Sequence, residues 1–196
     1  MKPTERGRKL NRELAPVPTV GMTASTELAE LLDARHAAAE PTIPSAAVVE
    51  SVATLLGEIR AATPATAHGG GEEPALDWAP QAMDETPVSM VVSGPAYTDN
   101  PIWYVNDAFE RLTGYGESDV LGENLRLLQG PETTAAAVAD LREAVDIWEA
   151  VVVELDNYRA DGSQFQNRVA IAPIADDTGT ISNWVGVQEQ RPIAER

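Results

Sequence analysis

The sequence predicts an α+β domain with an antiparallel sheet, preceded by a helical extension. Two short strand patterns are followed by helical patterns, and three longer strand patterns joined by tight turns complete the region. Strands joined by short turns pair antiparallel, and helices that interrupt such a series are typical of α+β folds. The composition agrees, since 43% of the 196 residues are hydrophobic and 23% are charged, which supports a packed core.

The expected strands are rich in Val, Ile and aromatic residues and are bounded by turn residues. They cover Val88–Val92, Ile102–Val105, 149–158, 164–173 and 180–190. The last three are joined by turns at 160–162 and 176–179, which contain Asp and Gly. This spacing favours a three-stranded meander at the end of the domain.

Two helices are expected between the second and third strands. The first is capped by Asn106 or Asp107 and ends at Gly114, because Asn and Asp accept backbone N–H bonds at a helix start and Gly tolerates the left-handed conformation at a helix end. The second covers 133–147. Its apolar face consists of Val138, Leu141 and Val145.

By composition the chain divides into five segments. They are a disordered basic arm (1–25), a helical extension (26–62), a linker (63–75), the α+β domain (76–190) and a tail (191–196). Within the extension, Leu28–Leu32 and Val48–Ile59 follow helical spacing, and Ser45 is placed to open the second helix. Two such short amphipathic helices need another surface to cover their apolar faces.

The net charge of −17 bears on partners and location. An acidic surface repels phosphate backbones and anionic lipid, so neither nucleic acid nor a membrane is expected as a partner. No segment reads as a membrane span or a secretion signal, which predicts a cytoplasmic protein. The acidic, Lys-poor composition suits a salt-rich halophile cytoplasm, and a high-GC soil bacterium would show the same bias. Cys is absent, which excludes disulfides, thiolate metal sites and cysteine nucleophiles.

One face of the last three strands is expected to carry three amides on an apolar wall, because side chains alternate across a strand. A hairpin centred near Gly162 places Asn157 opposite Asn167, and the last strand adds Trp184 and Gln188 to this face. Amides both donate and accept hydrogen bonds, which suits the edge of a flat heteroaromatic ligand. The same amides would serve equally well as strand-end caps bonded only to backbone, and the pattern by itself favours neither role.

The segment Gly122–Gly130 resembles the signature of the light-oxygen-voltage (LOV) branch of the PAS domains. It reads GENLRLLQG, against the family's G-x-N-C-R-F-L-Q-G, and is followed by PET. Further similar blocks are DNPIWYVNDAFERLTGY before it and DNY and GVQ after it, spaced as in the family over about residues 90–190. Several co-spaced blocks are far more specific than one short motif.

This resemblance implies a PAS fold in which five antiparallel strands and short helices enclose FMN, ahead of riboflavin or FAD. The candidate cofactor-binding residues, taken from the resemblance and from the sheet face, are Val91, Ser93, Asn100, Asn124, Leu125, Arg126, Leu128, Gln129, Val138, Leu141, Arg142, Val145, Asn157, Asn167, Val169, Ile171, Trp184 and Gln188. By the same resemblance Asn157 and Asn167 hold the pyrimidine edge of the isoalloxazine, and Gln188 lies near its O4 and N5.

The resemblance assigns Arg126 and Arg142 to the flavin phosphate, and the charge pattern supports that assignment. Only five basic residues lie between 88 and 190. A phosphate dianion in so acidic a protein needs local guanidinium groups, which bind its oxygens bidentately. Either arginine alone would be read as an ordinary surface charge.

Leu125 stands where the family has its reactive cysteine, and Leu127 stands at the following Phe position. In the family, light joins the cysteine sulfur to flavin C4a. A leucine has no sulfur and no nucleophile, so that route is closed here. A site that keeps the flavin-binding residues but lacks the thiol can still undergo photochemistry by electron transfer to the flavin. The aromatic residues that could donate electrons, each favoured as a packing residue, are Tyr97, Trp103, Tyr104, Trp148, Tyr158 and Trp184.

The leading hypothesis is a flavin-binding sensor of blue light or redox state. The alternatives are a PAS interaction module that dimerises without flavin, and a flavin-storage protein. An enzyme is not expected, because no Ser/His/Asp set, paired-carboxylate motif or phosphate loop stands out. A metal site is not expected either, because His36 and His68 are isolated.

Output is expected through the N-terminal helices, a homodimer or a separate effector protein, since no effector motif follows residue 190. The face of the last three strands opposite the amides is apolar, and its residues are Val152, Ala170, Ala172, Val185 and Val187. We expect one or both extension helices to dock there, in the same chain or across a dimer.

Overall fold

The computed structural model describes residues 46–62, 79, 83–84, 86–175 and 178–191. Several predictions fall outside these residues: the basic arm, the helix at Leu28–Leu32, the cap at Ser45, the linker at 63–75, and the environments of His36 and His68.

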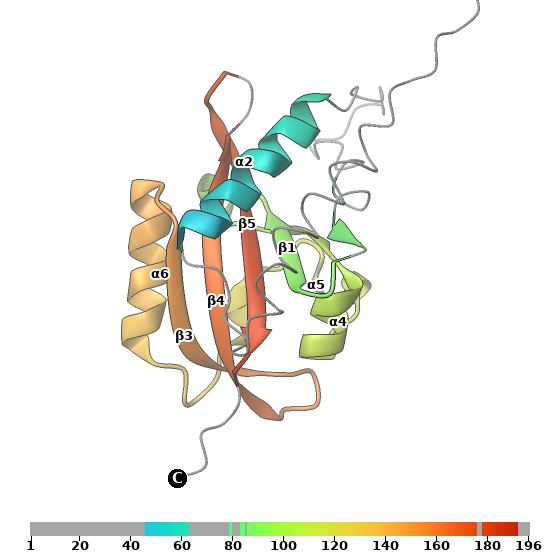
Figure 1. Cartoon of the computed structure of the whole chain (residues 1–196). Helices are drawn as coiled ribbons and strands as arrows, with labels where there is room; N and C mark the ends of the chain where they lie inside the picture. The colour runs from blue at the N-terminus through green and yellow to red at the C-terminus, as the bar shows by residue number, and fades with distance from the viewer. Residues whose placement is uncertain (1–45, 63–78, 80–82, 85, 176–177, 192–196) are drawn as a thin grey trace, which may run out of the picture.

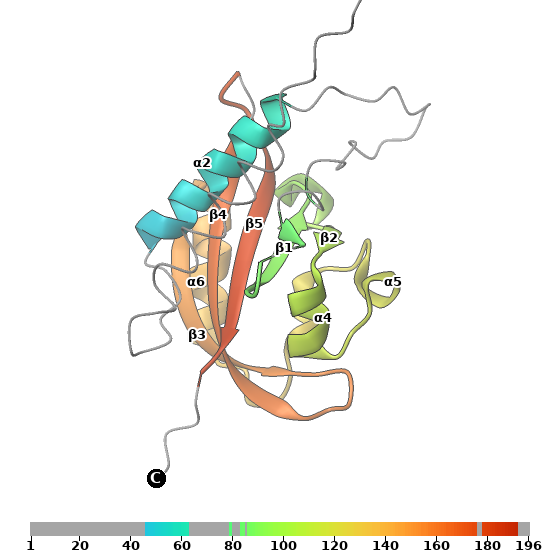
Figure 2. The same cartoon turned by 45° about the vertical axis from the view of Figure 1, so that its right-hand side comes forward.

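Five antiparallel strands form one sheet in the order β2-β1-β5-β4-β3 (Figures 1 and 2). They are β1 (Ser89–Ser93), β2 (Ile102–Val105), β3 (Val151–Tyr158), β4 (Gln164–Ala175) and β5 (Ile181–Gln190). The last three form the predicted meander, and β5 then pairs with β1, so the first and last strands meet inside the sheet. The predicted α+β class with a five-stranded antiparallel sheet is confirmed.

The inner face of the sheet is covered by the segment that connects β2 to β3. Its helices are α4 (Asp107–Thr113), α5 (Glu117–Val120) and α6 (Ala135–Ile147), and 3-10 turns lie at η1 (Ala96–Thr98), just before β2, and at η2 (Leu125–Leu128). The two helices that the sequence predicts are present, and the short elements η1, α5 and η2 were not predicted. Four residues or fewer carry too little periodicity to be recognised.

The predicted ends of α4 are confirmed in detail. The Asn106 side-chain oxygen accepts a hydrogen bond from the backbone N–H of Phe109 at 3.0 Å, which caps the helix start. At the other end Gly114 has a φ of 73°, a left-handed conformation in which a side chain would be strained.

The outer face of the sheet is covered by α2 (Ala46–Ala62), which crosses β4 and β5 in both views (Figures 1 and 2). Val49, Val52 and Leu56 are fully buried there. They pack in one apolar cluster that includes Ala170, Ala172, Val185 and Val187, with Val152 against its edge. The expected docking of the second extension helix on this face, within the same chain, is confirmed.

Close packing of α2 depends on a glycine in the helix. A methyl group added at Gly57 would lie 2.9 Å from the carbonyl oxygen of Ala175 at the end of β4. That distance is shorter than a carbon and an oxygen tolerate, so the absence of a side chain lets the helix approach the strand.

The register of the β3–β4 hairpin differs from the prediction by two residues. The observed pairs are Leu155 with Asn167 and Asn157 with Phe165. Asn157 is therefore not opposite Asn167, because the chain reverses around Asp161 rather than Gly162. The Asp161 side chain accepts a hydrogen bond from the N–H of Ser163 at 2.8 Å, which closes the turn one residue earlier than a glycine-centred turn would.

Candidate functional site

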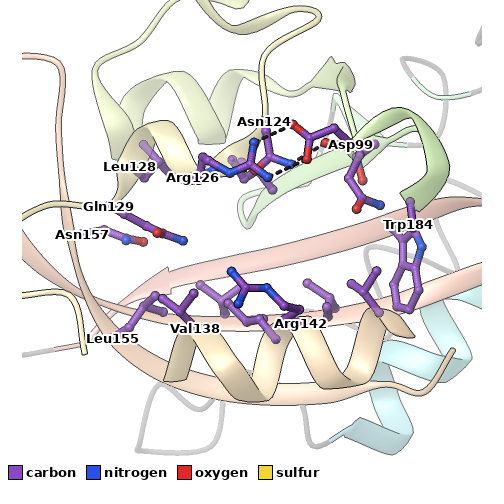
Figure 3. A pocket seen from close by; sticks show the side chains of 18 of the residues that line it. Asp99, Asn124, Arg126, Leu128, Gln129, Val138, Arg142, Leu155, Asn157 and Trp184 are labelled. Carbon is purple, nitrogen blue, oxygen red and sulfur yellow. Dashed lines mark hydrogen bonds and ion pairs between the residues drawn. The ribbon is translucent and has the colours of Figure 1, made fainter. Parts of the chain in front are cut away.

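The inner face of the sheet, α6 and the two 3-10 turns enclose a cavity of about 350 Å³ (Figure 3). This volume lies in the range of small-molecule sites. Sixteen of the eighteen candidate residues line it: Ser93, Asn100, Asn124, Leu125, Arg126, Leu128, Gln129, Val138, Leu141, Arg142, Val145, Asn157, Val169, Ile171, Trp184 and Gln188. The structure thus gathers side chains that are up to 95 positions apart in the sequence.

Two of the candidates do not line the cavity. Val91 is buried in an apolar cluster with Phe109 and Leu128. Asn167 is fully buried behind the wall, between Asn157 and Gln188, which both line it. Asn167 therefore does not line the cavity itself but orients, through hydrogen bonds, two side chains that do.

Four further residues line the cavity without having been proposed, and they are Ala96, Asp99, Asp146 and Leu155. Leu155 could have been found, because the strand alternation that places Asn157 also places the residue two positions earlier on the same face. Asp146 lies eight positions after Val138 and four after Arg142, so helical spacing also places it on this face of α6, and it was left out because it is not apolar. Ala96 and Asp99 belong to the short turn between β1 and β2, where no periodic pattern points inward.

The floor of the cavity is apolar. Val169 and Ile171 on β4 face Leu141 on α6, in a cluster with Val151, Val153 and Leu155. Leu125, the first residue of η2, lines the cavity and packs half-buried against the cluster around Phe109. A flat apolar ligand would therefore be held between aliphatic side chains on both sides.

Three buried amides form a hydrogen-bonded chain along one wall. The Asn167 side-chain N–H₂ group donates to the Asn157 side-chain oxygen and to the Gln188 side-chain oxygen, each at 2.9 Å. All three side chains are at most 3% exposed. Because both oxygens are bound to Asn167, the N–H₂ group of Gln188 is left to face elsewhere, whereas the N–H₂ group of Asn157 donates one bond to the Asp156 carbonyl at 3.3 Å and keeps its second N–H. This wall therefore offers hydrogen-bond donors to a ligand.

Two buried polar atoms at this site lack a hydrogen-bond partner within the described part of the chain. They are the side-chain oxygen of Asn167 and the indole nitrogen of Trp184. A buried polar group without a partner costs about 1–3 kcal/mol. Trp184 lines the cavity, but its indole nitrogen has no exposed surface there.

Arg126 is held at the cavity by Asp99. Its two terminal nitrogens donate to the two carboxylate oxygens at 2.5 and 2.6 Å, a bidentate pair. The Arg126 hydrogen bond holds the pKa of the Asp99 carboxyl below its usual value, and Asp99 in turn raises the pKa of Arg126. Asn124 contributes as well, since its N–H₂ donates to the Asp99 carbonyl at 2.5 Å.

Arg142 reaches the cavity from the other side. It projects from α6, whereas Arg126 projects from η2, and Figure 3 shows the two on opposite sides of the space with the Arg142 head pointing into it. The bidentate geometry of the Arg126–Asp99 pair is the one that a guanidinium adopts with any group presenting two oxygens side by side.

Other classes of site are not seen in the described residues. No cluster of three His, Asp or Glu side chains that could bind a metal ion occurs there. Over the same residues, no helix has both the length and the apolarity needed to cross a membrane.

A family model for the PAS domain matches residues 87–189, which is more than half of the chain. The chain belongs to the PAS domain family. Among solved structures, this PAS domain is similar to the LOV domain of the blue-light-activated histidine kinase from Erythrobacter litoralis, with 38% identity and a TM-score of 0.53. That match covers 56% of this chain and 100% of the other.

A LOV domain studied with a flavin analogue is also similar to this PAS domain, with 41% identity and a TM-score of 0.53 over 63% of this chain and 89% of the other. The bacterioopsin transcriptional activator of Halobacterium salinarum is 45% identical over 108 residues. The match covers 55% of this chain and 16% of that protein, so the chain spans a small part of its curated relative. The resemblance to LOV domains is confirmed.

Proposed function

We propose that the cavity binds FMN and that the chain is a sensor of blue light or redox state that works by flavin reduction rather than by a covalent adduct. The observation that carries this proposal is one cavity with an amide row, two arginines and Leu125 at the position of the LOV family's reactive cysteine. Flavin bound there would supply absorption of blue light and electron-transfer chemistry.

The residues present fit this ligand. Aliphatic side chains from β4, α6 and η2 would hold a flat ring system, and the amide row would face its polar edge with N–H₂ donors. Arg126 and Arg142 would bind the phosphate, with Arg126 exchanging the Asp99 carboxylate for phosphate oxygens.

Colour and photochemistry test this proposal. The purified protein, reconstituted with FMN, should show a structured flavin absorption band. Blue light with a thiol reductant should bleach that band, and oxygen should restore it. A protein that stays colourless after reconstitution would overturn the binding proposal, and an adduct-type, ultraviolet-shifted product in wild type would overturn the reduction mechanism.

Cysteine variants provide a matched pair. Leu125→Cys should open the adduct route, because Leu125 lines the cavity. Leu127→Cys adds the same thiol two residues away, at a side chain that packs against the apolar cluster and does not line the cavity. An adduct in neither variant, or in both equally, would contradict the placement of flavin beside Leu125.

The amide row also supports a route for the output. When flavin N5 is protonated on reduction, the Gln188 amide can rotate so that its oxygen, rather than its N–H₂ group, faces the flavin and accepts the new hydrogen bond. It cannot turn alone, because its nitrogen would then face the Asn167 N–H₂ that now binds its oxygen. If Asn167 turns as well, its unpartnered oxygen becomes the acceptor for Gln188. The amides of the row would therefore switch together.

Gln188 lies on β5 and Asn167 on β4, the two strands that α2 crosses. Gln188 faces the cavity, while its neighbours Val185 and Val187 face the cluster beneath α2. We propose that flavin reduction changes the docking of α2, and that a second copy or a separate effector reads the change.

Hydrogen exchange on residues 46–62 tests the output route, with oxidised and photoreduced protein compared in wild type and in Gln188→Leu. Reduction should lower protection in wild type only. Unchanged protection in wild type, or the same change in Gln188→Leu, would contradict it.

A further inference from the structure

We infer that Trp184 and Trp148 form a two-step electron path between the cavity and the protein surface. This inference rests on the proposed binding of flavin and assigns a role to two side chains outside the signature motif. Trp184 is the single aromatic residue among those that line the cavity in the described part of the chain. It is 3% exposed, whereas Trp148 is 40% exposed.

The two indoles are in contact. Their ring centroids are 6.1 Å apart and their planes are inclined by 23°, a stacked arrangement. Trp184 belongs to β5 and Trp148 follows the last residue of α6, so the pair joins two elements that enclose the cavity. An electron can therefore pass from solvent to the cavity wall through two adjacent π systems.

The backbone conformation of Trp148 supports its assignment to this path. Trp148 caps the C-terminus of α6 with a φ of 59°, in the left-handed region. Gly or Asn normally takes this position, and a bulky residue there is an outlier that the surrounding structure must compensate. At Trp148 the strained conformation directs the indole onto Trp184, and much of the ring stays in water. A helix cap alone would not need an aromatic side chain.

An external thiol is the electron donor for this path. Under blue light one electron passes from the Trp184 indole to the excited flavin, and Trp148 returns one electron to Trp184. The oxidised Trp148, at the surface, takes one electron from an external thiol. In sum the thiol loses one electron, the flavin gains one, and both indoles are restored. Without a thiol the electron returns from the flavin and no net reduction occurs.

Three tryptophan-to-phenylalanine variants, each loaded with FMN, test the path. Trp184→Phe should lose both the quenching of flavin fluorescence and the accumulation of reduced flavin under light with thiol. Trp148→Phe should keep the quenching, because Trp184 is still in place, and lose the accumulation. Trp103 on β2 does not line the cavity, so Trp103→Phe should change neither and serves as the control. Electron paramagnetic resonance at low temperature should show a tryptophan radical in wild type and lose it in Trp184→Phe.

Near-ultraviolet circular dichroism of the protein without flavin gives an independent readout. The signal of the stacked pair should be lost to the same extent in Trp148→Phe, in Trp184→Phe and in the double variant. Additive losses would overturn the contact. If Trp184→Phe no longer binds FMN, Trp148→Phe decides the question alone.

The outcomes separate this inference from the proposed function. Flavin that binds and is photoreduced equally well in wild type, Trp148→Phe and Trp184→Phe would overturn the path and leave the proposed function standing. A wild-type protein that binds no flavin would overturn both.

Discussion

Asn167→Ala removes the central member of the amide row. The Asn167 side chain is fully buried, and its N–H₂ group donates both hydrogen bonds that orient Asn157 and Gln188. The alanine leaves two side-chain oxygens without their donor. It also removes the Asn167 oxygen, which has no partner within the described residues.

The size of the effect follows from those two bonds. Each contributes about 0.5–1.5 kcal/mol net, so the free energy of unfolding without ligand should fall by about 1–3 kcal/mol. For a chain of this length that is a fall in melting temperature of roughly 2–12 °C. Water in the cavity can bond the two exposed oxygens, which keeps the loss near the net value of the bonds. A bound flavin would displace that water, so binding should weaken further.

Thermal unfolding and flavin titration, measured on the same samples, check both parts. The control is Asn183→Ala, another buried amide on β5, which bonds the Ser93 carbonyl at 3.3 Å and does not line the cavity. It should lower the melting temperature with little change in flavin affinity. If Asn167→Ala binds flavin as tightly as Asn183→Ala does, then the amide row does not orient the ligand and the reasoning fails.

Three further predictions concern charge and packing. Arg126→Ala and Arg142→Ala should each weaken FMN binding by roughly tenfold or more, and riboflavin binding much less, because a charge-assisted hydrogen bond is worth about 1.5–3 kcal/mol; equal losses for both ligands would remove the phosphate assignment. The pKa of Asp99 is below its ordinary value of 3.8, so the stability from its pair with Arg126 is present above that pH and is lost as the pH falls through the folded-state pKa; the difference in melting temperature between wild type and Asp99→Asn should therefore vanish in acid. Leu56→Ala should lower the free energy of unfolding, measured in urea, by about 2–5 kcal/mol, because Leu56 is fully buried between α2 and the sheet. The control Leu55→Ala should lower it by less, because Leu55 is only half-buried. Equal losses in the two variants would mean that α2 is not packed as described.

The sequence predicts the fold well because its signals are local and mutually consistent. The strand at Ile102–Val105 and the caps of α4 are found where the pattern places them, since cap chemistry and side-chain alternation act over a few residues. The five-stranded architecture then follows from the order of elements. The site residues in the signature and on the sheet could be named because the resemblance covers them as a co-spaced set.

Interactions made through space between irregular segments could not be predicted in this way. Asp99 lies in a turn without periodicity, and its pairing with Arg126 joins positions 27 residues apart. The stack of Trp148 on Trp184 depends on a left-handed residue at the end of α6, and sequence reasoning favoured both as ordinary packing residues. Pair geometry of this kind depends on where loops place side chains, which propensity does not encode.

In the hairpin between β3 and β4, the predicted register is wrong by two residues, but the predicted face of each side chain is correct. The predicted pairing of Asn157 with Asn167 is displaced by two residues, yet both amides lie on the same face and share a hydrogen bond of 2.9 Å. Side chains alternate with a period of two, so an even error in register moves a residue along the wall and an odd error moves it to the other face. An odd error here would have put Asn167 beneath α2, where a buried amide has only apolar neighbours and would cost about 1–3 kcal/mol unpaired. The apolar pattern of the outer face, fixed by Ala170 and Ala172, therefore restricts Asn167 to the cavity side whatever the geometry of the turn.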